Sequence, residues 1–163
     1  MLGFAKKLIC ITGLSLLCAC ESGREEAQQE SYDNIPSIED SELRGSAAEF
    51  IANAGDRVFY DYDTSALSQD AQEILRRQAD WLKANSAYRV LIEGHCDERG
   101  TREYNIGLGE RRANSAAKFL ENNGVDGSRI RTISYGKDRP VSAEGSQEEV
   151  NRVNRVAISV IER

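Results

Sequence analysis

Four short segments rich in β-branched and aromatic residues recur along residues 57–161, and longer, more polar stretches separate them. Runs of this length and composition predict β-strands. In the stretches between the first three of these segments, apolar residues recur at helical spacing. The expected order of elements is therefore β-α-β-α-β-β. This order predicts an α/β fold of two layers, a sandwich in which two helices pack on one face of a four-stranded sheet. The expected strands are 57–62, 88–93, 129–135 and 155–161.

Two segments carry the signals of amphipathic helices. Ser68 is a suitable N-cap, and apolar residues at helical spacing follow it to about Asn85. We expect the second helix to run from about Leu108 to Asn122, because the apolar stripe begins there and Gly124 supplies a stop. Segments 46–54 and 146–154 have compositions that shorter helices could adopt, the first of them against the domain or a partner.

The chain starts with a short basic segment and a 12-residue apolar run at 8–19. A membrane-spanning helix needs about 20 apolar residues, so this run has the length of a signal-peptide core instead. It ends in Leu-Cys-Ala-Cys at 17–20, which resembles the bacterial lipobox. We expect cleavage after Ala19 and lipidation of Cys20, since several acyl chains make a stable anchor. The alternative is an ordinary secretory signal that leaves Cys20 as a free thiol.

The rest of the chain divides into a tether and one domain. Residues 20–54 are polar and acidic, and they cannot bury enough apolar surface to offset the entropy of ordering. We therefore expect a flexible tether there and a folded domain at 55–163. The signal segment takes two of the 21 basic residues with it, which leaves 19 basic and 27 acidic residues, a formal charge of −8. This charge argues against nucleic acid as a partner.

The most distinctive stretch is GHCDERGTREYNIGLGERRAN at 94–114. Asp97 follows the second expected strand, and Arg112 lies one turn inside the next helix, on the same face as Leu108. A carboxylate can bind an ammonium group, and an arginine can bind a carboxylate through two parallel hydrogen bonds. The pair suits a zwitterionic ligand, although the spacing fits a buried structural ion pair equally well.

This stretch resembles the signature of the OmpA-like peptidoglycan-binding family through GH-x-DERGT-x-EYN-x-x-LGERRAN. The likeness covers residues 56–162, and it includes VFYDYDTSALS at 58–68 and NRVAISV at 154–160. Within the family, the lipobox and the acidic tether match the layout of the peptidoglycan-associated lipoproteins of the Tol-Pal system.

The resemblance implies a pocket for the stem peptide of peptidoglycan, centred on diaminopimelate. In the family, the residues at the positions of Asp97 and Arg112 hold the ammonium and carboxylate groups of diaminopimelate. Four further positions line the pocket by resemblance, namely Asp63, Thr64, Asn105 and Leu108.

The same resemblance implies the wider role. It predicts the Tol proteins, TolB especially, as partners, no cofactor, and a function in envelope integrity and cell division. Glu21 stands where an aspartate retains related lipoproteins at the inner membrane. We therefore expect an outer-membrane anchor with the domain facing the periplasm. The open alternative is another OmpA-like lipoprotein outside the Tol system.

Two positions depart from the family pattern, and other chemistries fit less well. Cys96 stands where the family usually has a small or hydroxyl residue, and Val156 stands where a second arginine is common. A metal site is not expected, because the consecutive residues 95–98 point apart, and we expect His95 to bond the loop backbone. Neighbouring carboxylates at 97 and 98 do not suit a glycosidase. A cell-wall hydrolase is the rival class, but no nucleophile or acid–base pair is recognisable, so we expect no enzyme.

Overall fold

The computed structural model describes residues 45–163. The expected signal peptide, the lipidation site Cys20 and the tether up to residue 44 lie outside the described residues. No helix within residues 45–163 is long and apolar enough to cross a membrane. The elements in chain order are α2 (Ala47–Asn53), β1 (Arg57–Phe59), α3 (Gln69–Ala84), β2 (Arg89–His95), α4 (Arg102–Asn122), the 3-10 turn η1 (Gly127–Arg129), β3 (Ile130–Gly136), α5 (Gln147–Asn154) and β4 (Val156–Glu162).

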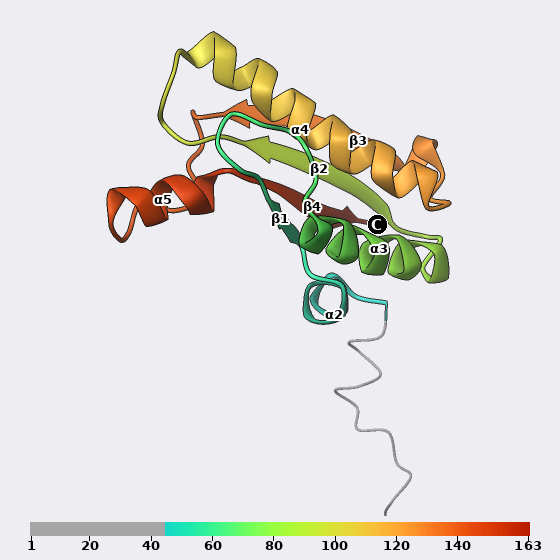
Figure 1. Ribbon diagram of the computed structural model, residues 1–163. Helices are drawn as coiled ribbons and strands as arrows, with labels where there is room; N and C mark the ends of the chain where they lie inside the picture. The colour runs from blue at the N-terminus through green and yellow to red at the C-terminus, as the bar shows by residue number, and fades with distance from the viewer. Residues whose placement is uncertain (1–44) are drawn as a thin grey trace, which may run out of the picture. The chain divides into compact units, whose positions relative to one another are not determined.

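The four strands form one sheet in the order β1-β4-β2-β3 (Figure 1). Strands β2 and β3 are parallel and α4 connects them, whereas β4 runs antiparallel to both β1 and β2. Val156 at the start of β4 pairs with Phe59, and Ala157 pairs with Gly94. The C-terminal ends of β1 and β2 and the N-terminal end of β4 therefore lie next to one another, at the same end of the strands.

The core lies between the sheet and helices α3 and α4, as the sequence predicts. Alternate residues of the strands face these helices, because side chains along a strand alternate between the two faces of a sheet. Val90 and Ile92 of β2 are fully buried there, together with Leu75 of α3 and Leu120 of α4. The opposite face is more open, and Ile133 of β3 is 40% exposed. The expected sandwich with helices on one face is confirmed.

Helix α4 begins six residues earlier than expected, at Arg102 instead of Leu108. Its N-cap is Thr101, whose hydroxyl accepts a hydrogen bond from the backbone N–H of Tyr104. The first turn has no apolar stripe, so hydrophobic spacing alone placed the start too late. The first strand is shorter than expected, since β1 ends at Phe59 and the chain turns through Asp63, which has a positive φ of 53°.

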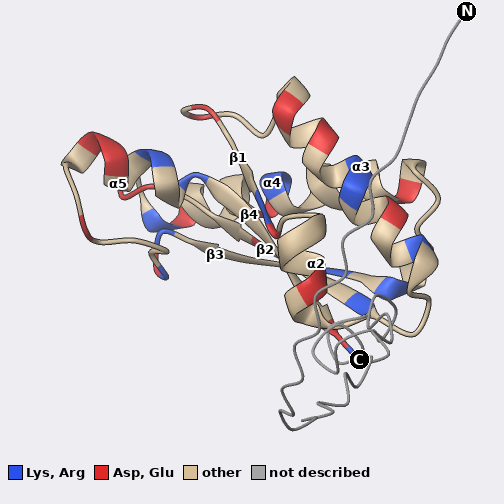
Figure 2. Ribbon diagram, turned by 90° about the horizontal axis from the view of Figure 1, so that it is seen from below, with Lys and Arg blue, Asp and Glu red and all other residues tan. Residues whose placement is uncertain are grey.

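Two short helices flank this core. The segment 46–54 does form a helix, α2, and it packs against the domain through Phe50, which is fully buried and lies edge-on to Trp81 with ring centroids 5.1 Å apart. Helix α5 starts with a capping box between Ser146 and Glu149. Both acidic and basic residues lie along α3 and along α5 (Figure 2). An anionic ligand would therefore need individually placed arginines.

Two glycines let α4 lie directly on β2. A Cβ atom at Gly94 would lie 1.9 Å from the carbonyl oxygen of Gly109, and one at Gly109 would lie 2.4 Å from the hydroxyl of Ser134. Neither position can accept a side chain without separating helix and sheet. This close approach brings the first half of α4 alongside the end of β2.

Candidate ligand-binding pocket

A small cavity of about 80 Å³ opens where the end of β2, the first half of α4 and the loop after β1 meet. Five of the six ligand-binding residues predicted from the sequence line it. The sixth, Thr64, does not. Its hydroxyl accepts a hydrogen bond from the backbone N–H of Ala66, and its carbonyl oxygen accepts one from Arg112 Nε. The lining residues are Tyr62, Asp63, Cys96, Asp97, Arg99, Gly100, Tyr104, Asn105, Leu108, Arg112 and Arg155.

Asp97 is the most buried carboxylate of the cavity and is 5% exposed. Its side chain is paired with the guanidinium of Arg99, and Arg155 Nη1 lies 3.4 Å from its Oδ2 atom. Burial by itself would raise the pKa of Asp97, but the hydrogen bonds and charge of Arg99, helped by Arg155, outweigh it and hold that pKa below the ordinary 3.8. The carboxylate is therefore ionised at neutral pH and already shared between two cations.

Arg112 is 1% exposed and donates mainly to backbone carbonyls. Its Nε atom donates to Thr64 O at 2.9 Å, Nη1 to His95 O at 2.9 Å and Nη2 to Asp61 O at 3.0 Å. A further contact joins Nη1 to the sulfur of Cys96 at 3.4 Å. Four of the five N–H groups of the guanidinium are thus engaged, and within residues 45–163 nothing accepts from the second N–H of Nη2.

The two residues do not form the buried ion pair that their spacing could also have meant. Among the described residues, the salt-bridge partners of Asp97 are Arg99 and Arg155, and Arg112 has none. Arg112 instead holds the loop after β1 against the end of β2, since its three carbonyl acceptors come from both segments. Arg112 thereby fixes the relative positions of two segments that form the cavity wall.

Asn105 and Leu108 shape the wall of the cavity. The amide of Asn105 donates to the carbonyl oxygens of Arg99 and Thr101, at 2.7 and 3.1 Å, which fixes the turn between β2 and α4. Leu108, 5% exposed, supplies an apolar surface. The thiol of Cys96 is buried and donates to Asn105 O at 3.4 Å, so this departure from the family pattern is accommodated by packing.

The outer rim carries residues that the sequence interpretation did not single out. The Arg99 guanidinium lies 4.0 Å from the centre of the Tyr62 ring, and the Tyr104 hydroxyl donates to Asp63. Tyr62 and Tyr104 are 60% and 47% exposed. Cation–π contact and an exposed aromatic rim are suited to holding a charged, flexible ligand.

The two cationic partners of Asp97 differ in how far they lie from it in the sequence. Arg99 is only two residues from Asp97, so its partnership could have been anticipated. Arg155 lies 58 residues away in sequence and reaches the site only because β4 inserts next to β2. His95 contacts the backbone of the loop after β3 and not of the loop that follows β2, with Nδ1 2.9 Å from Arg139 O. Within residues 45–163, no cluster of side chains could hold a metal ion.

A family model described as the OmpA family matches residues 59–155. The peptidoglycan-associated lipoprotein of Mesorhizobium japonicum is 56% identical over 98 residues, which cover 60% of this chain but only 58% of that protein. The peptidoglycan-associated lipoprotein of Haemophilus influenzae is 32% identical over 155 residues, 95% of this chain and 96% of that protein.

Solved structures agree with these matches. The crystal structure of the peptidoglycan-associated lipoprotein from Burkholderia pseudomallei has a TM-score of 0.63 and 34% identity, and the match covers 66% of this chain and 90% of that one. The C-terminal domain of Helicobacter pylori MotB has a TM-score of 0.59 at 22% identity, over 66% of this chain and 84% of that one, and so shares the fold. The chain therefore belongs to the OmpA family, and within that family to the peptidoglycan-associated lipoproteins.

Proposed function

We propose that the cavity at Asp97 binds the diaminopimelate residue of the peptidoglycan stem peptide without covalent bonds, and that the chain thereby links the outer membrane to the cell wall. The observation that carries this proposal is the buried Asp97 carboxylate. It lies in a cavity of about 80 Å³, in a chain whose relatives are named for their association with peptidoglycan. Cavities for drug-sized ligands measure roughly 300–1,000 Å³. This one suits the end of a side chain.

Binding would proceed by exchange of cations on Asp97. Arg99 holds the place of the ligand's ammonium group, and its side chain is 39% exposed, so it can swing out towards solvent. Arg155 is 9% exposed and stays behind as the fixed partner of the carboxylate. The displaced Arg99 guanidinium and the free N–H of Arg112 Nη2 then become available to the ligand's carboxylate.

This exchange explains how a polar ligand could bind a site that is already paired. The carboxylate loses one cation and gains another, so no charge is left buried and unpaired, which is the costly event in such sites. The ligand must carry both an ammonium and a carboxylate at the end of one side chain. Diaminopimelate has this end group, whereas lysine has the ammonium alone.

The test is co-sedimentation of the full-length chain with purified sacculi in the presence of two soluble competitors. A tripeptide ending in meso-diaminopimelate should release the protein from sacculi, and the same tripeptide with lysine should release it at least tenfold less well. Equal competition by both peptides would contradict the assigned ligand. Soluble wall fragments appearing in the same incubations would favour a hydrolase instead.

The anchor and the partner are separate parts of the proposal. Cys20→Ser should abolish labelling with fatty acid, because a hydroxyl cannot form the thioether, and should release the chain from outer membranes. A mutant that is still labelled would reject the lipobox assignment. TolB should co-purify with the wild-type chain, and its failure to do so would place the chain outside the Tol system.

A further inference from the structure

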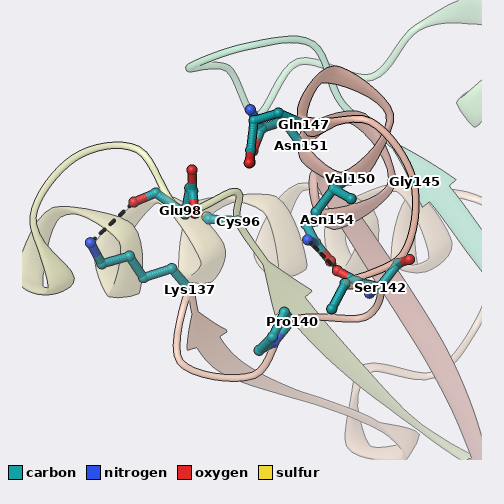
Figure 3. A pocket seen from close by; sticks show the side chains of 11 residues that line it. Cys96, Glu98, Lys137, Pro140, Ser142, Gly145, Gln147, Val150, Asn151 and Asn154 are labelled. Atoms are coloured by element: carbon teal, nitrogen blue, oxygen red, sulfur yellow. Dashed lines mark hydrogen bonds between the residues drawn. The ribbon is translucent and has the colours of Figure 1, made fainter.

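A second and larger cavity, of about 370 Å³, lies on the other side of the segment that follows β2 (Figure 3). Cys96 lines both the proposed diaminopimelate pocket and this cavity. The next two residues of the chain lie on opposite sides, since Asp97 lines the pocket and Glu98 lines the cavity. Its far wall is built by the loop after β3 and by α5. The proposed binding of diaminopimelate at Asp97 does not involve this second cavity.

One side chain of this cavity is buried without full use of its hydrogen-bonding groups. Asn151 of α5 is 5% exposed, and its Oδ1 atom accepts from the Gln147 amide at 3.2 Å. None of the hydrogen bonds among residues 45–163 uses its Nδ2 group. Figure 3 shows Asn151 and Gln147 together, extending from α5 towards Cys96 and Glu98. Among the described residues, the fully buried side-chain atoms without a hydrogen-bond partner are Trp81 Nε1 and His95 Nε2, so Asn151 Nδ2 keeps some access to solvent. A ligand in the cavity can therefore reach this donor and accept a hydrogen bond from it.

The remaining walls define the kind of ligand. Lys137 donates two of the three N–H groups of its Nζ atom to the carbonyl oxygens of Glu98 and Gly100, at 3.1 and 2.7 Å. The Glu98 carboxylate repels anions and can accept from a donor. Pro140 and Val150 add apolar surface. The cavity thus offers an amide donor, a charged acceptor, an ammonium group and apolar contacts.

This combination matches an acetamido group. Its carbonyl oxygen can accept from Asn151 Nδ2, its N–H can donate to the Glu98 carboxylate, and its methyl group can lie on Val150. We propose that the second cavity binds an N-acetylated sugar of the glycan strand, so that the domain contacts stem peptide and sugar at adjacent sites. This inference rests on the proposed function, because the sugar would be brought there by a stem peptide bound at Asp97.

The test compares two soluble ligands by calorimetry with the full-length chain. One is the tripeptide ending in diaminopimelate, and the other is the same tripeptide attached to the N-acetylglucosamine–N-acetylmuramic acid disaccharide. The wild-type chain should bind the sugar-bearing ligand roughly tenfold more tightly, the contribution of one or two additional hydrogen bonds and an apolar contact. Equal affinities would overturn the inference.

Two variants locate the effect. Asn151→Leu removes the amide at similar volume, and Ala143→Trp obstructs the cavity from an exposed position on its wall. Each should lower affinity for the sugar-bearing ligand to that of the bare tripeptide and leave tripeptide binding unchanged. Glu144→Trp, at the neighbouring exposed position outside the lining, is the control and should behave as wild type.

The outcomes distinguish this inference from the proposed function. Should the tripeptide bind and the sugar add nothing, or should both variants retain the tenfold difference, the sugar site is wrong and the stem-peptide site stands. If neither ligand binds, the proposed function fails and the sugar site fails with it.

Discussion

Replacing Asp97 by asparagine keeps the shape of the side chain and removes its charge, so it separates binding from folding. In the free protein, the change leaves Arg155 without its carboxylate, although Arg155 Nε still donates to Tyr60 O at 3.1 Å and the new amide oxygen can still accept. We expect a loss of about 2–3 kcal/mol in the free energy of unfolding. A domain with a stability of about 5 kcal/mol, the low end of the usual range, would then still be about 97% folded.

The effect on binding should be far larger than this. A carboxylate that meets an ammonium group in a largely buried site contributes about 2–5 kcal/mol when it is removed, which is roughly 30-fold to several thousandfold in affinity. Partial unfolding of a few per cent changes apparent affinity by less than about 1.1-fold. Loss of the carboxylate should therefore lower the apparent affinity by more than an order of magnitude beyond what partial unfolding can cause.

The assay is calorimetric titration with the diaminopimelate tripeptide, combined with urea unfolding of the same Asp97→Asn preparation. The surface change Asp80→Asn, at an exposed position on α3 with only an exposed partner in Lys83, is the matched control and should alter neither quantity by more than about 0.5 kcal/mol. A folded Asp97→Asn chain that binds the tripeptide like wild type would refute the assignment of Asp97 to the site.

Three further results follow from the same contacts. Arg112→Lys should cost about 2–4 kcal/mol in urea unfolding, because an ammonium cannot reach the carbonyls of Thr64, His95 and Asp61 together; unchanged stability would reject its role beneath the cavity. Gly109→Ala should cost about 1–3 kcal/mol by the same measurement, since its Cβ would lie 2.4 Å from a serine hydroxyl. Because the pKa of Asp97 is lowered on folding, its contribution to stability is present above about pH 4 and is lost as the pH falls through the folded value. Unfolding free energies measured down to about pH 2 should therefore fall less steeply in Asp97→Asn than in wild type.

Periodicity predicted the architecture because the sheet and helices each bury one face. Four segments rich in β-branched and aromatic residues, at 57–62, 88–93, 129–135 and 155–161, and the helical spacing between them predicted four strands and two covering helices. The start of α4 was missed because its first turn carries polar residues that face solvent and the loop. Thr101 followed by the acidic Glu103 was the available signal, since an N-cap and an early acidic residue mark a helix start.

The site was only partly predictable, for a different reason. The sequence motif indicated Asp97 and Arg112, and both do line one cavity. The motif could not reveal that Arg112 holds the loop after β1 against the end of β2. Its acceptors are backbone carbonyls, and every residue of the chain has one. The position of Arg155 depends on the place of β4 in the sheet, and strand order is not encoded in local spacing. The different burial of the two arginines that pair with Asp97, Arg99 and Arg155, could therefore be seen only in three dimensions.

The most direct test of the central proposal is a titration followed by NMR, in which the full-length chain receives the diaminopimelate tripeptide and the backbone amides are observed. The proposal predicts saturable shifts concentrated at 62–63, 97–100 and 104–112, with the side-chain Nε–H of Arg99 among the largest because that group leaves Asp97. The lysine tripeptide should produce much smaller shifts at the same concentration. Saturable shifts confined to other surfaces, or none at all with either peptide, would contradict the proposed site.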